Sequence, residues 1–377
     1  MRLVGEIGVA EVIAFVIGTT AEAIKVAPVI HRLRRRGEPI EIWATYQHTD
    51  SLDTTLGTLD LGRPHYVFTR GVNGKTIERP AQMIAWYRNC RRSLKRDRKQ
   101  LRERLGEHPL LVVHGDTMTT VFGAFAARRL KVPSAHIEAG LRSGNLLRPF
   151  PEEIDRRIVG KVAMIHFAPN AEATELLRRK GKDAVDTKNN TAIDGVLDTV
   201  DVDAPPAKQY GLVLLHRYEL MSKPALIKET LEVLDQTSPV PLTILTDAYS
   251  GGPVNEALRA LNSSKITASP KLEYPAFVNA MNQAEFVVTD SGGIQQEVGL
   301  LGVPTLLHRQ LTESPDGIGA NVVLSGWEMS AIEKFMTDYP GLRRDFVRPE
   351  TSPSDIIVSA LEARGYLSTA SGSAGRD

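Results

Sequence analysis

The sequence predicts an α/β protein built from two doubly wound, Rossmann-like domains that face a central cleft. Short, continuously apolar runs alternate with helical patterns over most of the 377 residues. Such runs are typical of parallel strands that helices cover on both faces. The alternation stops once, in the polar and proline-rich stretch 201–209, and then starts again. The chain is also too long for one typical hydrophobic core, so two domains are expected.

Residues 1–200 are expected to form the N-terminal domain. Its first buried strand is predicted in "EVIAFVI", residues 11–17, and a helix follows in "AEAIKVAPVIHRLRRRG". The later strands and helices of this domain are predicted in "PIEIWAT", "PLLVVHGD", "TTVFGAFAARRL", "SAHIEAG", "EEIDRRIVGKVA", "MIHFAPN" and "AEATELLRRKG". The basic stretch 88–104 has apolar residues at roughly helical spacing, which predicts a helix with a solvated charged face.

Residues 205–350 are expected to repeat this pattern as a C-terminal domain. Its elements are predicted in "YGLVLLH", residues 223–235, "LTILTD", residues 254–261, "KITAS", "YPAFVNAMNQA", "FVVTDSGG", "IQQEVGLLG" and "PTLLHR". Open parallel sheets bind ligands outside the carboxyl ends of their strands, so two such domains are expected to hold a ligand between them. The small and polar residues 367–377 are expected to be a disordered tail.

The composition argues against several classes of function. The formal net charge is +1, so no overall field indicates a nucleic-acid or membrane partner. No run of about 18 apolar residues occurs, and a transmembrane helix is not expected. Cys90 is the single cysteine, which excludes an intramolecular disulfide and a cysteine-built metal site and fits a reducing cytoplasm.

Familiar cofactor and hydrolase motifs are missing from the sequence. No G-x-G-x-x-G follows a predicted strand, and "GVNGKT", residues 71–76, is too short for a phosphate-binding loop. H-E-x-x-H and G-x-S-x-G do not occur either. We therefore expect neither a cofactor nor a bound metal, and nucleophilic hydrolysis is disfavoured.

Three carboxylates stand at element ends in the N-terminal domain. Asp116 follows a buried strand in "VVHGDTMTT", Glu138 follows the next strand in "HIEAGLRSG", and Glu152 begins a helix in "PFPEEIDRR". Each could be a helix cap, and for Asp116 alone capping is the simpler interpretation. Together they are expected to converge on one cleft, where crowding and burial separate carboxylate pKa values. Such a group favours proton transfer in both directions.

The C-terminal domain offers a site for an anion. Ser291, Gly292 and Gly293 form a predicted turn between a strand and a helix, where backbone amides and the helix N-terminus attract phosphate. Glu297, one turn into that helix, could accept hydrogen bonds from ribose hydroxyls. His216 ends another strand and is expected at a second phosphate contact, with a buried structural histidine as the alternative. These residues suggest a bound nucleotide diphosphate whose sugar is exposed to the carboxylates.

These motifs resemble the UDP-N-acetylglucosamine 2-epimerase family over nearly the whole chain, and "HGDT", "HIEAGLRSG", "PFPEE" and "TDSGGIQQE" together are highly specific. The resemblance implies the GT-B architecture, a homodimer, and a C-terminal helix, here residues 354–364, that packs back on the first domain. It also implies anti elimination of UDP across C1–C2 through a 2-acetamidoglucal. UDP then adds again while a proton reaches the opposite face of C2, and no redox cofactor is needed. The expected setting is cell-surface polysaccharide biosynthesis in the cytoplasm.

The resemblance also implies roles for individual residues. Asp116, Glu138 and Glu152 match the acids of the family, and His216 matches its histidine near the diphosphate. These four are the expected catalytic residues. The UDP-sugar is expected to contact Lys25, Arg156, Phe277, Ser291, Gly292, Gly293 and Glu297. Phe277 would stack on uracil, and core packing is the alternative for this side chain.

Three departures from the family pattern leave alternatives open. Thr20 stands where the first loop usually has an arginine, Ser314 stands where an arginine is common, and "TDAYSGGPVNEAL" replaces a His-x-Asn-Pro segment. Because that segment helps form an allosteric substrate site in bacterial members, we expect turnover without activation by the substrate. A hydrolysing epimerase that releases N-acetylmannosamine and UDP, an epimerase for another UDP-sugar, a GT-B glycosyltransferase and an inactive sensor remain alternatives.

Overall fold

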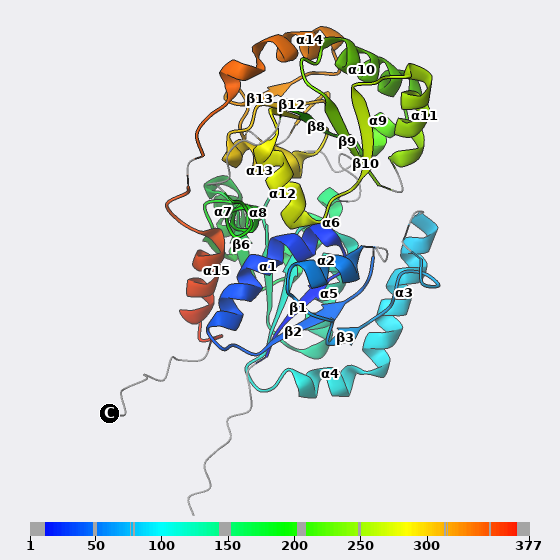
Figure 1. Cartoon of the computed structure of the whole chain (residues 1–377). Helices are drawn as coiled ribbons and strands as arrows, with labels where there is room; N and C mark the ends of the chain where they lie inside the picture. The colour runs from blue at the N-terminus through cyan, green and yellow to red at the C-terminus, as the bar shows by residue number, and fades with distance from the viewer. Residues whose placement is uncertain are drawn as a thin grey trace, which may run out of the picture. The chain divides into compact units, whose positions relative to one another are not determined.

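The computed structural model describes residues 12–47, 51–75, 77, 80–142, 152–201, 209–247, 250–312, 314, 316–346 and 348–367. The chain divides into two compact units (Figure 1). Unit 1 comprises Met1–Gly195 and Thr351–Asp377, and unit 2 comprises Val196–Glu350. The division falls shortly before the polar stretch at which the sequence suggested a boundary. Except for Leu367, the predicted tail lies outside the described residues.

Unit 1 contains a seven-stranded parallel sheet in the order β3-β2-β1-β4-β5-β6-β7. Its strands are β1 (Ile13–Ile17), β2 (Ile40–Ala44), β3 (Tyr66–Val67), β4 (Leu110–His114), β5 (Ser134–Ile137), β6 (Ile165–Ala168) and β7 (Asp183–Asp186). Its helices are α1 (Thr20–Arg35), α2 (Leu52–Thr58), α3 (Pro80–Arg96), α4 (Arg98–Arg104), α5 (Met118–Leu130), α6 (Glu152–Val162), α7 (Ala171–Arg178) and α15 (Pro353–Glu362). The strand order reverses between β1 and β4, where sheets of this type bind ligands.

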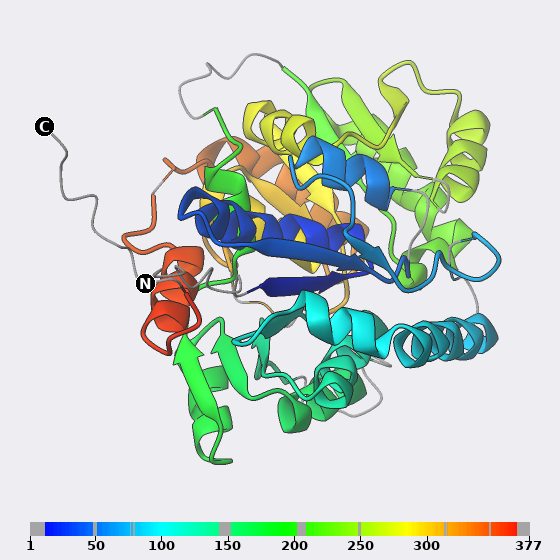
Figure 2. The ribbon, with the colours of Figure 1, turned by 90° about the horizontal axis from the view of Figure 1, so that it is seen from below.

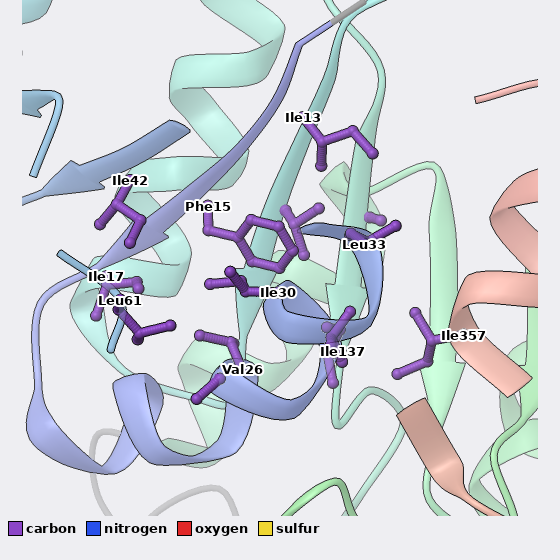
Figure 3. Packing of buried hydrophobic residues seen from close by; sticks show 14 of the residues in the cluster. Ile13, Phe15, Ile17, Val26, Ile30, Leu33, Ile42, Leu61, Ile137 and Ile357 are labelled. Carbon is purple, nitrogen blue, oxygen red and sulfur yellow. The ribbon is translucent and has the colours of Figure 1, made fainter. Parts of the chain in front are cut away.

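Strand β1 illustrates how both faces of this sheet are buried. Its side chains alternate between two hydrophobic clusters, because successive residues of a strand point to opposite faces. Phe15 and Ile17 pack with α1, α2 and α15, and Figure 3 shows Phe15 close to Ile30 of α1. Ala14 and Val16 pack with α3, α4, α5 and α6. Figure 2 shows α1 and the cyan helices α3 and α4 on opposite sides of β1.

The last described helix, α15, packs against α1 although the whole of unit 2 separates them in the sequence. Ile357 of α15 belongs to the same hydrophobic cluster as Leu33 of α1 (Figure 3). The guanidinium of Arg32 donates a hydrogen bond of 2.6 Å to Asp355 at the start of α15. The chain therefore returns to unit 1 to complete its core.

The basic stretch predicted as one helix is two helices in the structure. Helix α3 ends at Arg96 and α4 begins at Arg98. Asp97, between them, accepts a hydrogen bond of 2.5 Å from the hydroxyl of Tyr66 and pairs with Arg96 at 2.7 Å. These contacts fix the break beside strand β3, and no periodicity of apolar residues could have predicted them.

Unit 2 contains a six-stranded parallel sheet in the order β10-β9-β8-β11-β12-β13. Its strands are β8 (Gly211–Leu214), β9 (Leu242–Thr246), β10 (Ile266–Pro270), β11 (Phe286–Thr289), β12 (Thr305–Leu307) and β13 (Val322–Leu324). Its helices are α9 (Tyr218–Met221), α10 (Pro224–Thr237), α11 (Gly251–Leu261), α12 (Tyr274–Gln283), α13 (Gly292–Leu301), α14 (Met329–Asp338) and the 3-10 helix η1 (Tyr339–Leu342). A short helix, α8 (Ala192–Leu197), spans the division between the units.

The strand order of unit 2 reverses between β8 and β11, as it does between β1 and β4 in unit 1. Helices α10, α11 and α14 pack with the strands in one hydrophobic cluster, and α12 lies beside α13 (Figure 1). The two sheets confirm the predicted pair of doubly wound α/β domains. The central cleft between them stays a prediction.

Candidate active site

The loop after β1 is tied to the loop after β4 by one buried carboxylate, Glu22. Its Oε2 accepts hydrogen bonds from the backbone of Gly18 at 2.7 Å and of Thr19 at 2.9 Å. Its Oε1 accepts a hydrogen bond of 2.5 Å from the hydroxyl of Thr117. Gly18 is required here, because an added Cβ would lie 2.0 Å from the hydroxyl of Thr119. The two loops at the reversal of unit 1 therefore form one hydrogen-bonded structure.

Asp116 lies in the loop after β4 and does not cap a helix. The side chain of Thr117 caps α5 by accepting from the backbone of Thr120. The Oδ2 atom of Asp116 instead accepts from Arg156 of α6, at 2.7 Å from Nε and 2.6 Å from Nη2. The capping interpretation of Asp116 is therefore wrong, and its partner is an arginine that the sequence placed in the site.

Glu138 follows β5 in a left-handed backbone conformation, with φ of 64°. Its Oε2 lies 2.6 Å from the Nζ of Lys25 and 3.2 Å from the Nε2 of His114. Burial raises the pKa of this carboxyl, but the Lys25 ammonium and His114 lower it more, so the net pKa lies well below the ordinary value. Glu138 is therefore held as a carboxylate at neutral pH.

The first turn of α6 places several carboxyl groups beside Arg156. Glu152 begins the helix, and its Oε2 is buried without a hydrogen-bond partner among the described residues. Glu153 pairs with Arg157 at 2.9 Å and lies 3.7 Å from Arg156. Asp155 is 3% exposed, and burial, with repulsion from nearby carboxylates, raises its pKa to about 7. The segment 143–151, which precedes α6, lies outside the described residues.

The structure therefore brings Asp116, Arg156, Glu152 and the Lys25–Glu138 pair to loops and helix ends of unit 1. Asp155 lies on the same turn of α6 as Glu152, so this part of unit 1 holds one carboxyl with a depressed pKa, Glu138, and one with a raised pKa, Asp155. Such a separation provides an ionised group that can take up a proton and a neutral group that can supply one.

In unit 2, the loops at the point where the strand order reverses are joined by Asp290, which directly follows β11. This carboxylate is buried and accepts hydrogen bonds from the backbone amides of His216, at 3.0 Å, and Arg217, at 2.8 Å. It thereby joins the loop after β8 to the loop after β11. Burial lowers the pKa of His216, and the imidazole lies 3.4 Å from Asp290. His216 is thus held at the expected end of the sheet.

The Ser291–Gly292–Gly293 turn leads into α13. Ser291 is the N-cap, and its hydroxyl accepts from the backbone of Ile294 at 3.5 Å. Among the described residues, a Cβ added at Gly292 would meet only the guanidinium of Arg309, at 3.6 Å, and one at Gly293 would meet only Ser291, at 3.8 Å. The packing of unit 2 itself does not require glycine at these positions, so space remains beside the helix N-terminus for a ligand.

Two side chains on α13 are buried and fixed by hydrogen bonds. Glu297 accepts from the hydroxyl of Tyr274 at 3.1 Å, and burial keeps the pKa of Tyr274 well above its ordinary value. Gln295 donates to the carbonyls of Ser314 and Asp316 at 2.9 Å, which fastens the segment after β12 to the helix. Phe277 of α12 is half-buried and is not part of the hydrophobic cluster that α10, α11 and α14 form with the strands.

An open groove of about 880 Å³ lies elsewhere in unit 1, along α3 and the second half of α5. The residues that line it include the aromatic Phe122 and Phe125 and the cations Arg91, Arg92, Lys95, Arg98, Arg128, Arg129 and Lys131. None of the predicted site residues lines this groove. Its size therefore does not identify it as the reaction site.

Within the described parts of the chain, no cluster of three or more His, Cys, Asp or Glu could hold a metal ion. The same residues include no helix long and apolar enough to cross a bilayer. Cys90 is buried, and burial raises the pKa of its thiol.

The sequence did not identify several polar residues that organise the site. Glu22, Asp290 and Gln295 bind backbone or neighbouring loops, and they look like ordinary helix-start or strand-end residues in the sequence. Asp155 was visible only as one acid among several in "PEEIDRR". Its burial depends on elements far apart in the chain, so no local pattern marks it.

Comparisons with known proteins agree on one family. Residues 31–344 match the family model described as UDP-N-acetylglucosamine 2-epimerase. A UDP-N-acetylglucosamine 2-epimerase of Campylobacter jejuni is 30% identical over 336 residues, covering 82% of this chain and 84% of that protein.

Two solved structures are similar over nearly the whole chain. The Neisseria meningitidis UDP-GlcNAc 2-epimerase bound to UDP-GlcNAc has a TM-score of 0.77 at 27% identity, covering 93% of this chain and 100% of that one. The UDP co-structure of S. aureus MnaA has a TM-score of 0.76 at 28% identity, covering 97% of this chain and 100% of that one. The chain belongs to the UDP-N-acetylglucosamine 2-epimerase family.

Proposed function

We propose that this chain interconverts UDP-N-acetylglucosamine and UDP-N-acetylmannosamine. The observation that carries the proposal is the group of ion-paired carboxylates at the strand ends of unit 1. Glu138 lies 2.6 Å from Lys25, and Asp116 lies 2.6 Å from Arg156. Inversion at C2 requires a group that removes a proton from one face and a group that supplies one to the other. Redox chemistry is not needed for this exchange.

The reaction proceeds by anti elimination and re-addition. A carboxylate takes the C2 proton while the C1–O bond to UDP breaks, which leaves a 2-acetamidoglucal. A second carboxyl group then protonates the opposite face of C2 as a diphosphate oxygen of UDP re-forms the bond to C1. Asp116, Glu138 and Glu152 are the proposed acids and bases, and His216 lies at the diphosphate. One carboxyl group gains a proton and another loses one, so the total number of protons is the same before and after the reaction. UDP leaves C1 and returns to it.

Unit 2 holds the nucleotide in this proposal. The turn Ser291–Gly292–Gly293 gives the diphosphate access to backbone amides at the positive end of α13. Glu297, whose orientation Tyr274 fixes, accepts hydrogen bonds from the ribose. Phe277 stacks on the uracil ring. Lys25 and Arg156 contact the sugar-phosphate portion while they hold the carboxylates.

Incubation with UDP-N-acetylglucosamine tests the proposal, with the products followed by proton and phosphorus NMR. UDP-N-acetylmannosamine that accumulates to a constant ratio, with no free UDP, is the expected result. Free N-acetylmannosamine with stoichiometric UDP would assign the hydrolysing reaction instead. If the substrate stays unchanged, three candidate functions remain: a glycosyltransferase, a sensor, and an epimerase for another UDP-sugar. Assays with a panel of other UDP-sugars would identify such an epimerase.

We further propose a homodimer that works in the cytoplasm and supplies cell-surface polysaccharide biosynthesis. A buried, single cysteine supports a reducing compartment. Light scattering of the purified protein measures the assembly directly, and a mass of one chain at micromolar concentration would contradict the dimer.

A further inference from the structure

Asp155 is a buried acid for which the reaction proposed above gives no role. It lies on the first turn of α6, three residues after Glu152 and next to Arg156. Only 3% of the residue is exposed. Among the described residues, its Oδ2 has no hydrogen-bond partner, and the Oε2 of Glu152 has none either. A buried carboxylate without a partner is costly, so a group in this position tends to take up a proton.

The cations around Asp155 pair with other carboxylates. Arg156 binds Asp116 at 2.6 Å and lies 3.7 Å from Glu153. Arg157 binds Glu153 at 2.9 Å. Among the described residues, no ion pair is formed by Asp155. In the part of the site that the structure describes, the carboxyl groups thus outnumber the cations that pair with them.

The charged groups that face Asp155 come from each neighbouring element. Asp116 follows β4, and Glu152 lies on the same helix; both repel a charge on Asp155. Arg142 follows β5 and interacts with Glu153. Helix α5 packs on α6. Its only charged residues are Arg128 and Arg129, which lie in its last turn and are exposed. Among the described residues, the charges that act on Asp155 are therefore mainly those of the carboxylates Asp116 and Glu152.

We propose that Asp155 is a positioning residue that stores, buried and un-ionised, the proton on which Asp116 and Glu152 draw during turnover. The inference rests on the proposed epimerisation. In one turnover, the group that removes the proton from C2 gains a proton, and the group that protonates the opposite face of C2 loses one. The two groups must exchange a proton before the next turnover in the same direction. A neutral acid beside them, shielded from water, supplies that proton and takes it back.

The electrostatics agree with this geometry. Burial, followed by repulsion from Asp116 and Glu152, raises the pKa of Asp155 to about 7. The acid is therefore half protonated near neutral pH, where a group donates and accepts a proton with equal ease. Because charges on Asp116 and Glu152 contribute to the raised pKa of Asp155, removal of either charge should lower that pKa.

Infrared spectroscopy of the resting enzyme tests the stored proton without any turnover. At about pH 6, one pH unit below the expected midpoint, wild-type protein should show a protonated-carboxyl band that is absent from Asp155→Asn. The band should disappear by about pH 8. Asp116→Asn is the matched control: it should keep the band but move its midpoint to lower pH, because one repelling charge is gone. A spectrum of wild type identical to that of Asp155→Asn would overturn the proposal.

The pH dependence of kcat/KM tests the use of that proton. Asp155→Asn should lower kcat/KM about tenfold or more near pH 7 and move its alkaline limb to lower pH, whereas Asp155→Glu should restore much of both. A structural role alone would lower activity by the same factor at every pH, and that result would contradict the proposal. If wild type does not epimerise UDP-N-acetylglucosamine, the proposed function fails, and the infrared titration still decides whether Asp155 holds a proton.

Discussion

The two units have the same strand order at their centres, but the chemistry at their strand ends differs. In unit 1, Asp116 and Glu138 point their carboxylates at cations of other elements, Arg156 and Lys25. In unit 2, the corresponding carboxylate, Asp290, accepts hydrogen bonds from backbone amides of the neighbouring loop. One topology thus carries ion-paired acids at the strand ends of one sheet and an open glycine turn at those of the other. Function therefore follows from the loops and not from the fold.

The largest expected effect comes from removing the charge of the acids in unit 1. Asp116→Asn, Glu138→Gln and Glu152→Gln should each lower turnover by about 10²–10⁴-fold, because each removes a general acid or base. Binding of UDP should survive, since the turn Ser291–Gly292–Gly293 and Glu297, which we propose to hold UDP, lie in unit 2. Glu175→Gln, on the exposed face of α7, is the matched control and should leave turnover unchanged. Near-normal turnover in all three variants would remove the assignment of these acids.

The opposite behaviour is expected in unit 2. Glu297→Ala and Phe277→Ala should each weaken UDP binding roughly tenfold or more. The first removes a hydrogen bond to a charged group, which contributes about 1.5–3 kcal/mol, and the second removes an aromatic ring that stacks on a base, which contributes about 1–3 kcal/mol. Turnover at saturating substrate should change less than affinity does. Calorimetry with UDP measures the effect, and Glu256→Ala on the surface of α11 serves as control. An unchanged UDP affinity in both variants would mean that the nucleotide binds elsewhere.

The raised pKa of Asp155 predicts a change of stability with pH that its replacement removes. In the folded protein the group titrates at about 7, against an ordinary value of 3.8. Between these values the folded state binds more protons than the unfolded state, so folding stability falls as pH rises through this window. Asp155→Asn should flatten that fall, and its Tm relative to wild type should therefore rise by a few degrees from about pH 5 to about pH 8. Thermal melts at matched ionic strength measure this difference, and parallel curves would contradict it.

The smallest effect concerns regulation. Thr20, Ser314 and the segment after β9 lack the cationic or histidine side chains that the family resemblance implies for a second substrate site. We therefore expect the reverse reaction, started from UDP-N-acetylmannosamine alone, to run without a lag. A reaction that stays silent until a trace of UDP-N-acetylglucosamine is added would show that the second site works despite these substitutions.

The fold was largely predictable because a strand that is buried on both faces of its sheet is a continuous apolar run in the sequence. The run around Phe15 is apolar at every position, and it forms a strand whose side chains enter two clusters. The contacts of the site were less predictable. The pairing of Asp116 with Arg156 joins positions 40 residues apart, and the simpler capping role belongs to Thr117. The left-handed backbone of Glu138 and the burial of Asp155 likewise arise from tertiary structure, which periodicity does not encode.

The central claim is that unit 1 exchanges the proton at C2 while unit 2 holds UDP. Its most direct test is the wild-type reaction with UDP-N-acetylglucosamine in deuterated water, followed by NMR of the C2 position. We expect deuterium to enter C2 of both UDP-sugars as they equilibrate, and Glu138→Gln to slow this entry about 100-fold or more at unchanged UDP affinity. Epimerisation that retains the original hydrogen at C2 would contradict proton exchange by these carboxylates.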